Sequence, residues 1–166
     1  MLGLSLVLVV LVLSYILLNP VNAIKHSDGH FYRASCDDNL DRLSELRRIS
    51  IKIIGGLPTS PRKMFVLWKL GRCVFVERPI QAQKPYLALT VDKGRELEIC
   101  LDYSDRNTLL YVLIHELAHV MSFTTGHTKE FYRNVDRLLT SAKEQGIYTG
   151  SPRKNVTFCG SHIDVD

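Results

Sequence analysis

The first 24 residues of this 166-residue chain contain no charged side chain, and the first charge belongs to Lys25. All 21 basic and 17 acidic residues therefore lie in the remainder, whose net charge is only +4. So mild and dispersed an excess of positive charge does not favour nucleic acid as a partner. There is also no internal repeat and no low-complexity tract, and the length is that of one domain.

Cysteine is scarce, and no C-x-x-C pair is present. A structural zinc held by thiolates is therefore not expected. The even count permits two disulfides in three connectivities, and whether any forms stays open. The cysteines are Cys36, Cys73, Cys100 and Cys159. Asn155 begins a glycosylation sequon, which has meaning only if the domain faces a secretory lumen.

Residues 2–18 are an almost pure Leu/Val/Ile run. As a helix this run would be roughly 26 Å long, near the lower limit for crossing a bilayer. We predict a signal anchor over residues 1–24, which places the protein as a single-pass protein of a host or virion membrane. One alternative is a cleaved signal peptide and a secreted protein, because small residues precede a possible cleavage site near Ala23. A buried core helix is the third interpretation, and the run lacks the polar face typical of one.

Residues 25–38 are polar and aromatic, and we expect a stalk or irregular lead-in before a domain over residues 39–166. In that domain, apolar residues recur at helical spacing in several segments that end at glycine. The predicted helices cover residues 37–54, residues 61–71, residues 105–123 and residues 128–146. The tail from Ile147 onward is expected to be irregular.

Two further segments favour strands. Residues 95–101 alternate between polar and apolar side chains, which is the period of a strand with one buried face. Residues 86–91 form the other run, and Asp92-Lys93-Gly94 between them supplies the turn chemistry of a hairpin. Residues 73–76 are also expected to be extended. The pattern as a whole predicts an α+β domain with a small sheet.

The chemistry is concentrated in His115-Glu116-Leu117-Ala118-His119, inside the predicted helix 105–123. Histidines at i and i+4 project about 40° apart, so both imidazoles can reach one zinc ion at roughly 2 Å. Glu116 lies about 100° further round, where a carboxylate can act on a water as general base. Burying these polar groups without partners would cost several kcal/mol, whereas a metal and its water would satisfy them.

A third ligand is expected after the helix breaks. His127 follows Gly126, which can turn the chain back, and we predict that it completes the set with His115 and His119. Glu130 is the competing candidate because a glutamate is the third zinc ligand in some catalytic sites. It can instead interact with the positive end of the helix that carries it.

The segment before His115, together with Gly126-His127 and the aromatic Phe131, resembles the WLM and SprT-like metallopeptidases. It is more similar still to zincin-like proteins encoded by large double-stranded DNA viruses. In these a hairpin with a Lys-Gly turn precedes the helix, and Gly-Ile-Tyr and Cys-Gly elements follow it, here Gly146-Ile147-Tyr148 and Cys159-Gly160. The resemblance covers roughly residues 40–163. It implies a zinc-binding, zincin-like α+β fold, and the spacing differs from that of the metzincins.

The predicted function is that of a membrane-associated zinc metallopeptidase, an endopeptidase that hydrolyses peptide bonds through a zinc-activated water. Three imidazoles leave zinc an open position, and Glu116 would take the proton. A peptide or protein substrate would pair with an exposed edge of the hairpin 86–101. The donor that stabilises the oxyanion stays open among Tyr132, Tyr148 and His162.

Two rival functions remain at this point. One is a membrane-anchored structural or virion protein that keeps zinc only for stability. The other is a DNA–protein crosslink protease, by analogy with the WLM and SprT-like enzymes. The hydrophobic N-terminus and the lack of a dense basic patch count against the second. The oligomeric state and the natural substrate are not indicated by the sequence.

Overall fold

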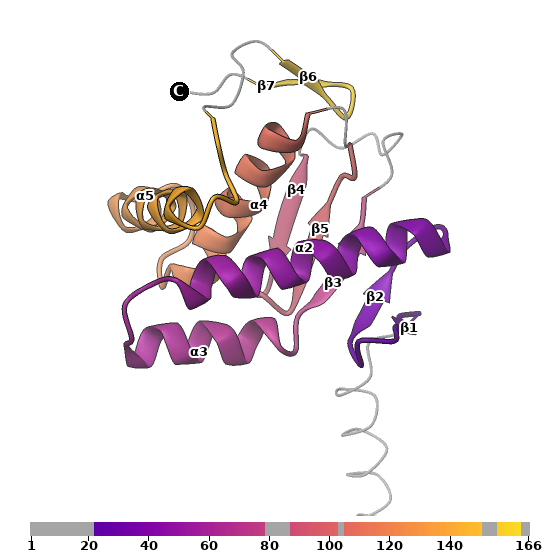
Figure 1. Cartoon of the computed structure of the whole chain (residues 1–166), viewed down its shortest axis with the longest axis horizontal. Coiled ribbons are helices and arrows are strands. Elements are labelled where there is room, and N and C mark those ends of the chain that lie inside the picture. The colour runs from indigo at the N-terminus through magenta and orange to yellow at the C-terminus, as the bar shows by residue number, and fades with distance from the viewer. Residues whose placement is uncertain (1–21, 79–86, 103–104, 151–155, 164–166) are drawn as a thin grey trace, which may run out of the picture.

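The computed structural model describes residues 22–78, 87–102, 105–150 and 156–163. These residues form a mixed α+β fold with four helices, a five-stranded sheet and a separate two-stranded sheet, which confirms the predicted α+β class (Figure 1). The helices are α2 (Asp37–Gly55), α3 (Pro61–Leu70), α4 (Arg106–Met121) and α5 (Lys129–Glu144). The strands are β1 (Ile24–Lys25), β2 (Phe31–Arg33), β3 (Val74–Glu77), β4 (Ala88–Val91), β5 (Glu96–Ile99), β6 (Val156–Phe158) and β7 (Ser161–Ile163).

The four helices lie within two residues of their predicted bounds. Side-chain caps explain where three of them begin. The Ser60 hydroxyl accepts from the Lys63 amide at the start of α3, and the Thr128 hydroxyl caps α5 in the same way. At α4 the Asp105 carboxylate accepts from two backbone amides of the first turn. Such caps satisfy amides that have no partner within the helix.

The predicted hairpin is also confirmed, as β4 and β5 pair antiparallel with Ala88 opposite Ile99. Its turn uses Asp92, Lys93 and Gly94, all with positive φ. A Cβ on Gly94 would lie 2.9 Å from a methyl group of Val120, so the close approach of the turn to α4 requires glycine. The sheet order is β1-β2-β3-β5-β4, which leaves β4 at an edge of the described sheet.

One face of the main sheet is covered by helices. Strand β4 packs against α4 and β3 packs against α2, while α4 and α5 pack against each other. Leu97 and Ile99 point into this interface and are fully buried. The alternate residues Glu96 and Glu98 form ion pairs with arginines instead, as expected for an antiparallel hairpin with one polar face.

The N-terminal part of the described chain differs from the predicted stalk. Strand β2 pairs in parallel with β3, and β1 pairs with β2, so this segment adds two short strands to the sheet. Tyr32 is fully buried, and its hydroxyl donates to Asp28. The sequence did not predict these strands, because the segment is polar and each strand is too short to show an alternation of buried and exposed residues. The tail differs too, since β6 and β7 pair antiparallel where an irregular segment was expected.

The predicted single-pass membrane placement is contradicted. Within the part of the chain that the structure describes, no helix combines the length and the apolar character needed to cross a bilayer. The hydrophobic run 2–18, on which that prediction and the secreted alternative depended, lies outside the described residues, and so does Asn155.

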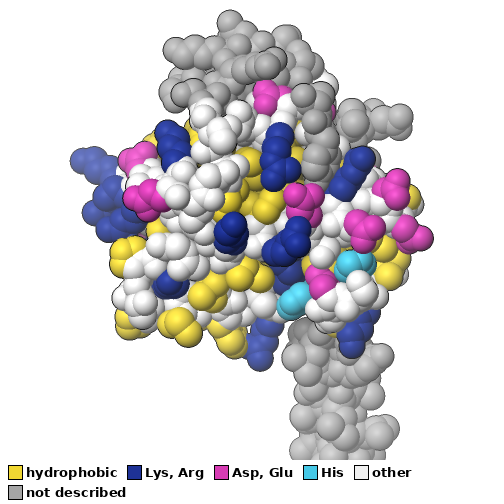
Figure 2. Space-filling model, viewed as in Figure 1, with side chains coloured by type: hydrophobic (Ala, Val, Ile, Leu, Met, Phe, Trp, Pro, Cys, Tyr) yellow, Lys and Arg dark blue, Asp and Glu magenta, His cyan; other side chains and the backbone are white. Residues whose placement is uncertain are grey.

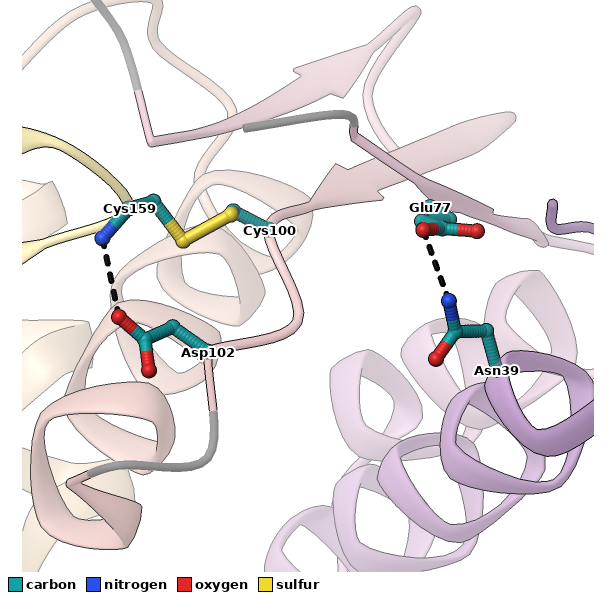
Figure 3. Close-up of a disulfide and its surroundings, with 5 residues drawn as sticks. All are labelled: Asn39, Glu77, Cys100, Asp102 and Cys159. Atoms are coloured by element: carbon teal, nitrogen blue, oxygen red, sulfur yellow. Dashed lines mark hydrogen bonds between the residues drawn. A yellow bond between two sulfur atoms is a disulfide. The ribbon is translucent and has the colours of Figure 1, made fainter. Parts of the chain in front are cut away.

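One disulfide joins Cys100 at the end of β5 to Cys159 in the turn between β6 and β7 (Figure 3). The Cys159 amide also donates to the Asp102 carboxylate at 3.2 Å. The other two cysteines are free: Cys36 is exposed and Cys73 is buried. The crosslink ties the C-terminal hairpin to the main sheet, and it resolves a pairing that the sequence left open.

Candidate metal centre

Three imidazoles meet at the C-terminal end of α4. His115 and His119 lie one turn apart on that helix, and His127 reaches back from the loop between α4 and α5. One ring nitrogen from each lies within 4.8 Å of the other two. The Nε2 atoms of His115 and His127 are 3.0 Å apart. The structure therefore brings together all three histidines that the sequence predicted, and their role as metal ligands stays a prediction.

Phe131 forms a common support for the three rings. Its ring centroid lies 4.8, 4.4 and 4.7 Å from those of His115, His119 and His127. The Phe131 side chain is itself buried on α5. Because one fixed aromatic ring contacts all three imidazoles, packing between α4 and α5 restricts their orientation before any ion binds.

Glu116 points away from solvent toward the edge strand. Its side chain is 6% exposed, and the Thr90 hydroxyl on β4 donates to its carboxylate at 2.7 Å. Burial raises the pKa of Glu116 to about 7, although the hydrogen bonds from Thr90 act in the opposite direction. A carboxyl group with this pKa exchanges its proton readily at neutral pH, which suits a general base.

Burial has the reverse effect on the histidines. It lowers the pKa of His115 to about 4, with further contributions from His119 and His127. It also lowers the pKa of His119 to about 4, assisted by His127 and by Lys93. Both imidazoles are therefore neutral at pH 7, and a neutral imidazole has the free lone pair that a metal requires.

Glu130, the competing candidate for third ligand, is engaged elsewhere. One carboxylate oxygen pairs with Arg62 at 2.5 Å, and the other accepts from the amides of Phe123 and Thr124. These contacts lower the pKa of Glu130 to about 2, with the Arg62 hydrogen bond as the main cause. Glu130 thus shapes the loop that carries His127, and the positive φ of Gly126 completes the turn.

Of the three candidate oxyanion donors, Tyr132 is the one whose ring lies near the cluster, with its centroid 6.3 Å from that of His127. Tyr148 is buried, and its pKa is raised to about 12 by burial and by the charges of Tyr111 and Asp105. Tyr148 is close enough to Asp105 to be affected by its charge, and Asp105 caps the N-terminal end of α4. The histidines lie near the other end of that helix, so Tyr148 is separated from them. The side chain of His162 lies outside the described residues.

Sequence reasoning missed three residues of this site: Thr90, Lys93 and the supporting role of Phe131. The Lys93 ammonium donates to the carbonyls of Ser122 and Thr124, just beyond α4. No local pattern marks these side chains, because their roles depend on how the hairpin packs against α4. Asp92-Lys93-Gly94 predicts a turn, but nothing in its pattern indicates that Lys93 contacts the end of α4.

The relatives found among known proteins are viral. An uncharacterized protein of Acanthamoeba polyphaga mimivirus is 35% identical over 89 residues, which cover 49% of this chain and 45% of that protein. An uncharacterized protein of Invertebrate iridescent virus 6 is 29% identical over 90 residues, which cover 49% of this chain and 50% of that protein. One from Invertebrate iridescent virus 3 is 46% identical over 52 residues, 31% of each chain.

These relatives support the prediction of a viral protein. The chain spans half or less of the length of the curated relatives it matches. No family model matches the chain, and no solved structure matches it significantly.

Proposed function

We propose that this protein is a zinc-dependent peptidase of the zincin type, with His115, His119 and His127 as ligands and Glu116 as general base. The main support for this proposal is that three imidazole nitrogens converge next to Glu116, a buried carboxylate on the helix that carries two of the three histidines. Three protein ligands with one open position are typical of catalytic rather than structural zinc sites.

The donor set fits zinc. Tetrahedral coordination at about 2.0–2.1 Å places ligand nitrogens roughly 3.4 Å apart. The nitrogens here lie within 4.8 Å of one another, and the closest pair is 3.0 Å apart, so small side-chain rotations would suffice. The neutral state of His115 and His119 at pH 7 meets the chemical requirement as well. Zinc at this position would supply Lewis acidity, polarising a carbonyl and making water a better nucleophile.

Glu116 handles the proton in this proposal. Its carboxylate accepts a proton as water attacks the scissile carbonyl, and it returns that proton to the departing amine. Thr90 holds one carboxylate oxygen and so orients the group. A pKa near 7 lets one residue perform both transfers without a large energetic cost for either.

In this proposal the substrate would bind along the edge strand β4. In the described sheet β4 pairs only with β5, and its outer edge is open for pairing with an extended peptide. The same strand carries Thr90, which touches Glu116. A peptide along β4 would therefore pass beside the general base, and Tyr132 is the nearest candidate donor for the oxyanion.

The test is incubation of the full-length, zinc-loaded protein with a peptide library. Cleavage should occur, stop after chelation and return when zinc is restored. The His119→Ala variant should lose both zinc and cleavage. As the matched control, His26→Ala removes a histidine that pairs with Asp41 outside the cluster, and it should retain both.

Two results would count against the proposal. Cleavage that resists chelation would remove the metal from the mechanism. A stable, stoichiometric zinc complex that cleaves no peptide in the library would instead assign the site to stability.

A further inference from the structure

The outer face of α3 exposes large apolar side chains. Met64, Phe65 and Trp68 are 58%, 47% and 55% exposed. The helix contains no acidic residue, and basic residues flank these three: Lys63 precedes Met64, and Lys69 follows Trp68. Figure 2 shows hydrophobic and basic side chains side by side along the margin where Figure 1 places α3, with no acidic side chain visible among them. An exposed apolar and cationic strip of this kind is typical of a binding surface.

The cations are held in place by the aromatic rings. The Phe65 and Trp68 rings stack with centroids 5.8 Å apart. The Lys69 ammonium lies 4.9 Å from the Phe65 centroid, and the Arg72 guanidinium lies 4.3 Å from that of Trp68. Cation–π contacts of this kind fix positive charge at the surface without neutralising it.

This strip borders a pocket of about 470 Å³ between the end of α3 and the β4–β5 turn. We refer to its charged side, formed by Trp68, Lys69, Arg72, Lys93 and Arg95, as the basic pocket. Asp92, the one acidic residue in the lining, pairs with Arg95 at 2.9 Å.

The other three cations of the basic pocket contact backbone carbonyls or an aromatic ring. Lys69 donates to the carbonyl of Lys93 at 2.9 Å, and Lys93 donates to the carbonyls of Ser122 and Thr124. Within the described ranges no carboxylate forms an ion pair with Lys69, Arg72 or Lys93. The pKa of Lys69 is lowered by burial and by the charge of Lys93, as expected for two like charges that lack a counter-ion.

The basic pocket is continuous with the proposed substrate path. Its Lys93 belongs to the turn that directly follows β4, and Gly94 beside it packs against Val120, the residue after His119. A peptide paired along β4 and extended beyond Val91 would therefore reach Lys93 first and then Lys69 and Arg72.

We propose that the basic pocket binds an acidic stretch of the same polypeptide that lies along β4, so that the substrates are proteins with Asp- or Glu-rich segments beside the cleavage site. This inference rests on the proposed peptidase function. Charge complementarity selects the occupant, because the pocket offers several unneutralised cations to one ligand. A polypeptide is favoured over single-stranded nucleic acid because Lys69 and Arg72 already lie over the rings on which bases would stack.

Binding to the full-length Glu116→Gln chain provides the test, since binding needs no turnover. The probes are two labelled extended peptides. One has a run of glutamates at its N-terminus, and the other has the run at its C-terminus. Each is compared with a peptide in which these glutamates are replaced by glutamines. At least one acidic peptide should bind roughly tenfold more tightly than its neutral counterpart, and added salt should reduce the difference.

The pocket variant is Lys69→Gln with Arg72→Gln, made in the Glu116→Gln chain. It should lose most of that preference. Its matched control, Arg48→Gln with Lys52→Gln, removes the same charge from the exposed side of α2 and should keep the preference. When the same two substitutions are made in the chain that keeps Glu116, KM for the acidic peptide should rise and kcat should stay nearly unchanged.

Equal binding of acidic and neutral peptides would overturn the inference. So would equal loss in the pocket and control variants, or tighter binding of an anionic vesicle or a single-stranded oligonucleotide through Lys69 and Arg72. A different result is that the chain with Glu116 intact hydrolyses no peptide while the acidic peptide still binds through the basic pocket. That result would overturn the proposed peptidase function and retain the basic pocket as a peptide-binding surface.

Discussion

Two of the buried charged side chains, Arg47 and Glu116, lie in very different surroundings. Arg47 on α2 is 2% exposed, and its guanidinium donates to the carbonyls of Leu70 and Cys73. The same group lies 5.2 Å from the ring centroid of Tyr32 and 5.1 Å from that of Phe75. Glu116 is 6% exposed and accepts a hydrogen bond from one neutral hydroxyl.

The difference separates a structural charge from a reactive one. Carbonyl oxygens and ring faces stabilise the permanent charge of Arg47, which in return joins α2 to the segment between α3 and β3. Glu116 receives too little compensation to stay ionised at low cost, so its pKa rises to about 7. A group held near its titration point can move protons at neutral pH, whereas the guanidinium of Arg47 cannot.

Removing Arg47 should have the largest effect on stability. Arg47→Ala leaves the carbonyls of Leu70 and Cys73 without their donor and opens space between two rings. We expect the free energy of unfolding to fall by about 3 kcal/mol or more. Arg48→Ala, at an exposed neighbouring position, should change it by less than about 0.5 kcal/mol. Denaturant unfolding measures both, and a loss below about 1 kcal/mol for Arg47→Ala would show that the buried guanidinium is not the structural member of the pair.

Removing the hydroxyl that holds Glu116 should affect catalysis more than stability. Because the Thr90 hydrogen bonds lower the pKa of Glu116, Thr90→Val should raise it further. The acidic limb of the pH–rate profile should move to higher pH, and kcat should fall roughly 10–100-fold. Thr140→Val on the exposed side of α5 is the matched control, and it should leave the profile in place. An unchanged acidic limb in Thr90→Val would remove Thr90 from the site.

The buried histidines should make the metal-free protein sensitive to acid. Burial lowers the pKa of His115 and of His119 in the folded chain to about 4, from an ordinary value of about 6.5. Glu116→Gln is the background for the measurement because it removes the opposing titration of Glu116, and we expect both histidine pKa values to stay low in it. The unfolded chain therefore takes up more protons as the pH falls below about 6.5, and stability decreases until about pH 4. We expect Tm to fall by roughly 5 °C over this range.

Differential scanning fluorimetry of the metal-free variant measures this decrease in Tm. Adding His115→Asn and His119→Asn should flatten the profile between pH 6.5 and 4. A profile that stays equally steep would assign the acid sensitivity to other groups.

The sequence predicted those parts of the molecule that depend on local pattern. The alternation of Glu96, Leu97, Glu98 and Ile99 indicated β5, and the i and i+4 spacing of His115 and His119 indicated that the two imidazoles lie side by side. In both cases one secondary-structure element already carries the information, because its period fixes which side chains share a face.

What the sequence did not predict depends on contacts between distant segments. Strand β2 is short and gains its place by pairing with β3, so Tyr32 was assigned to a stalk although it lies in the core. Thr90 has no distinguishing pattern, and it reaches Glu116 only because β4 packs against α4. The pairing of Cys100 with Cys159 likewise follows from the position of the C-terminal hairpin.

The most direct test measures zinc content and peptide cleavage on one preparation of the Glu116→Gln variant. We expect one zinc per chain, as in the unaltered protein, together with a loss of cleavage of at least about 10³-fold, because the ligands remain while the proton acceptor is gone. Glu144→Gln, at an exposed position on α5, should retain both properties. Cleavage retained by Glu116→Gln would contradict the assigned role of this carboxylate, and so would loss of the zinc.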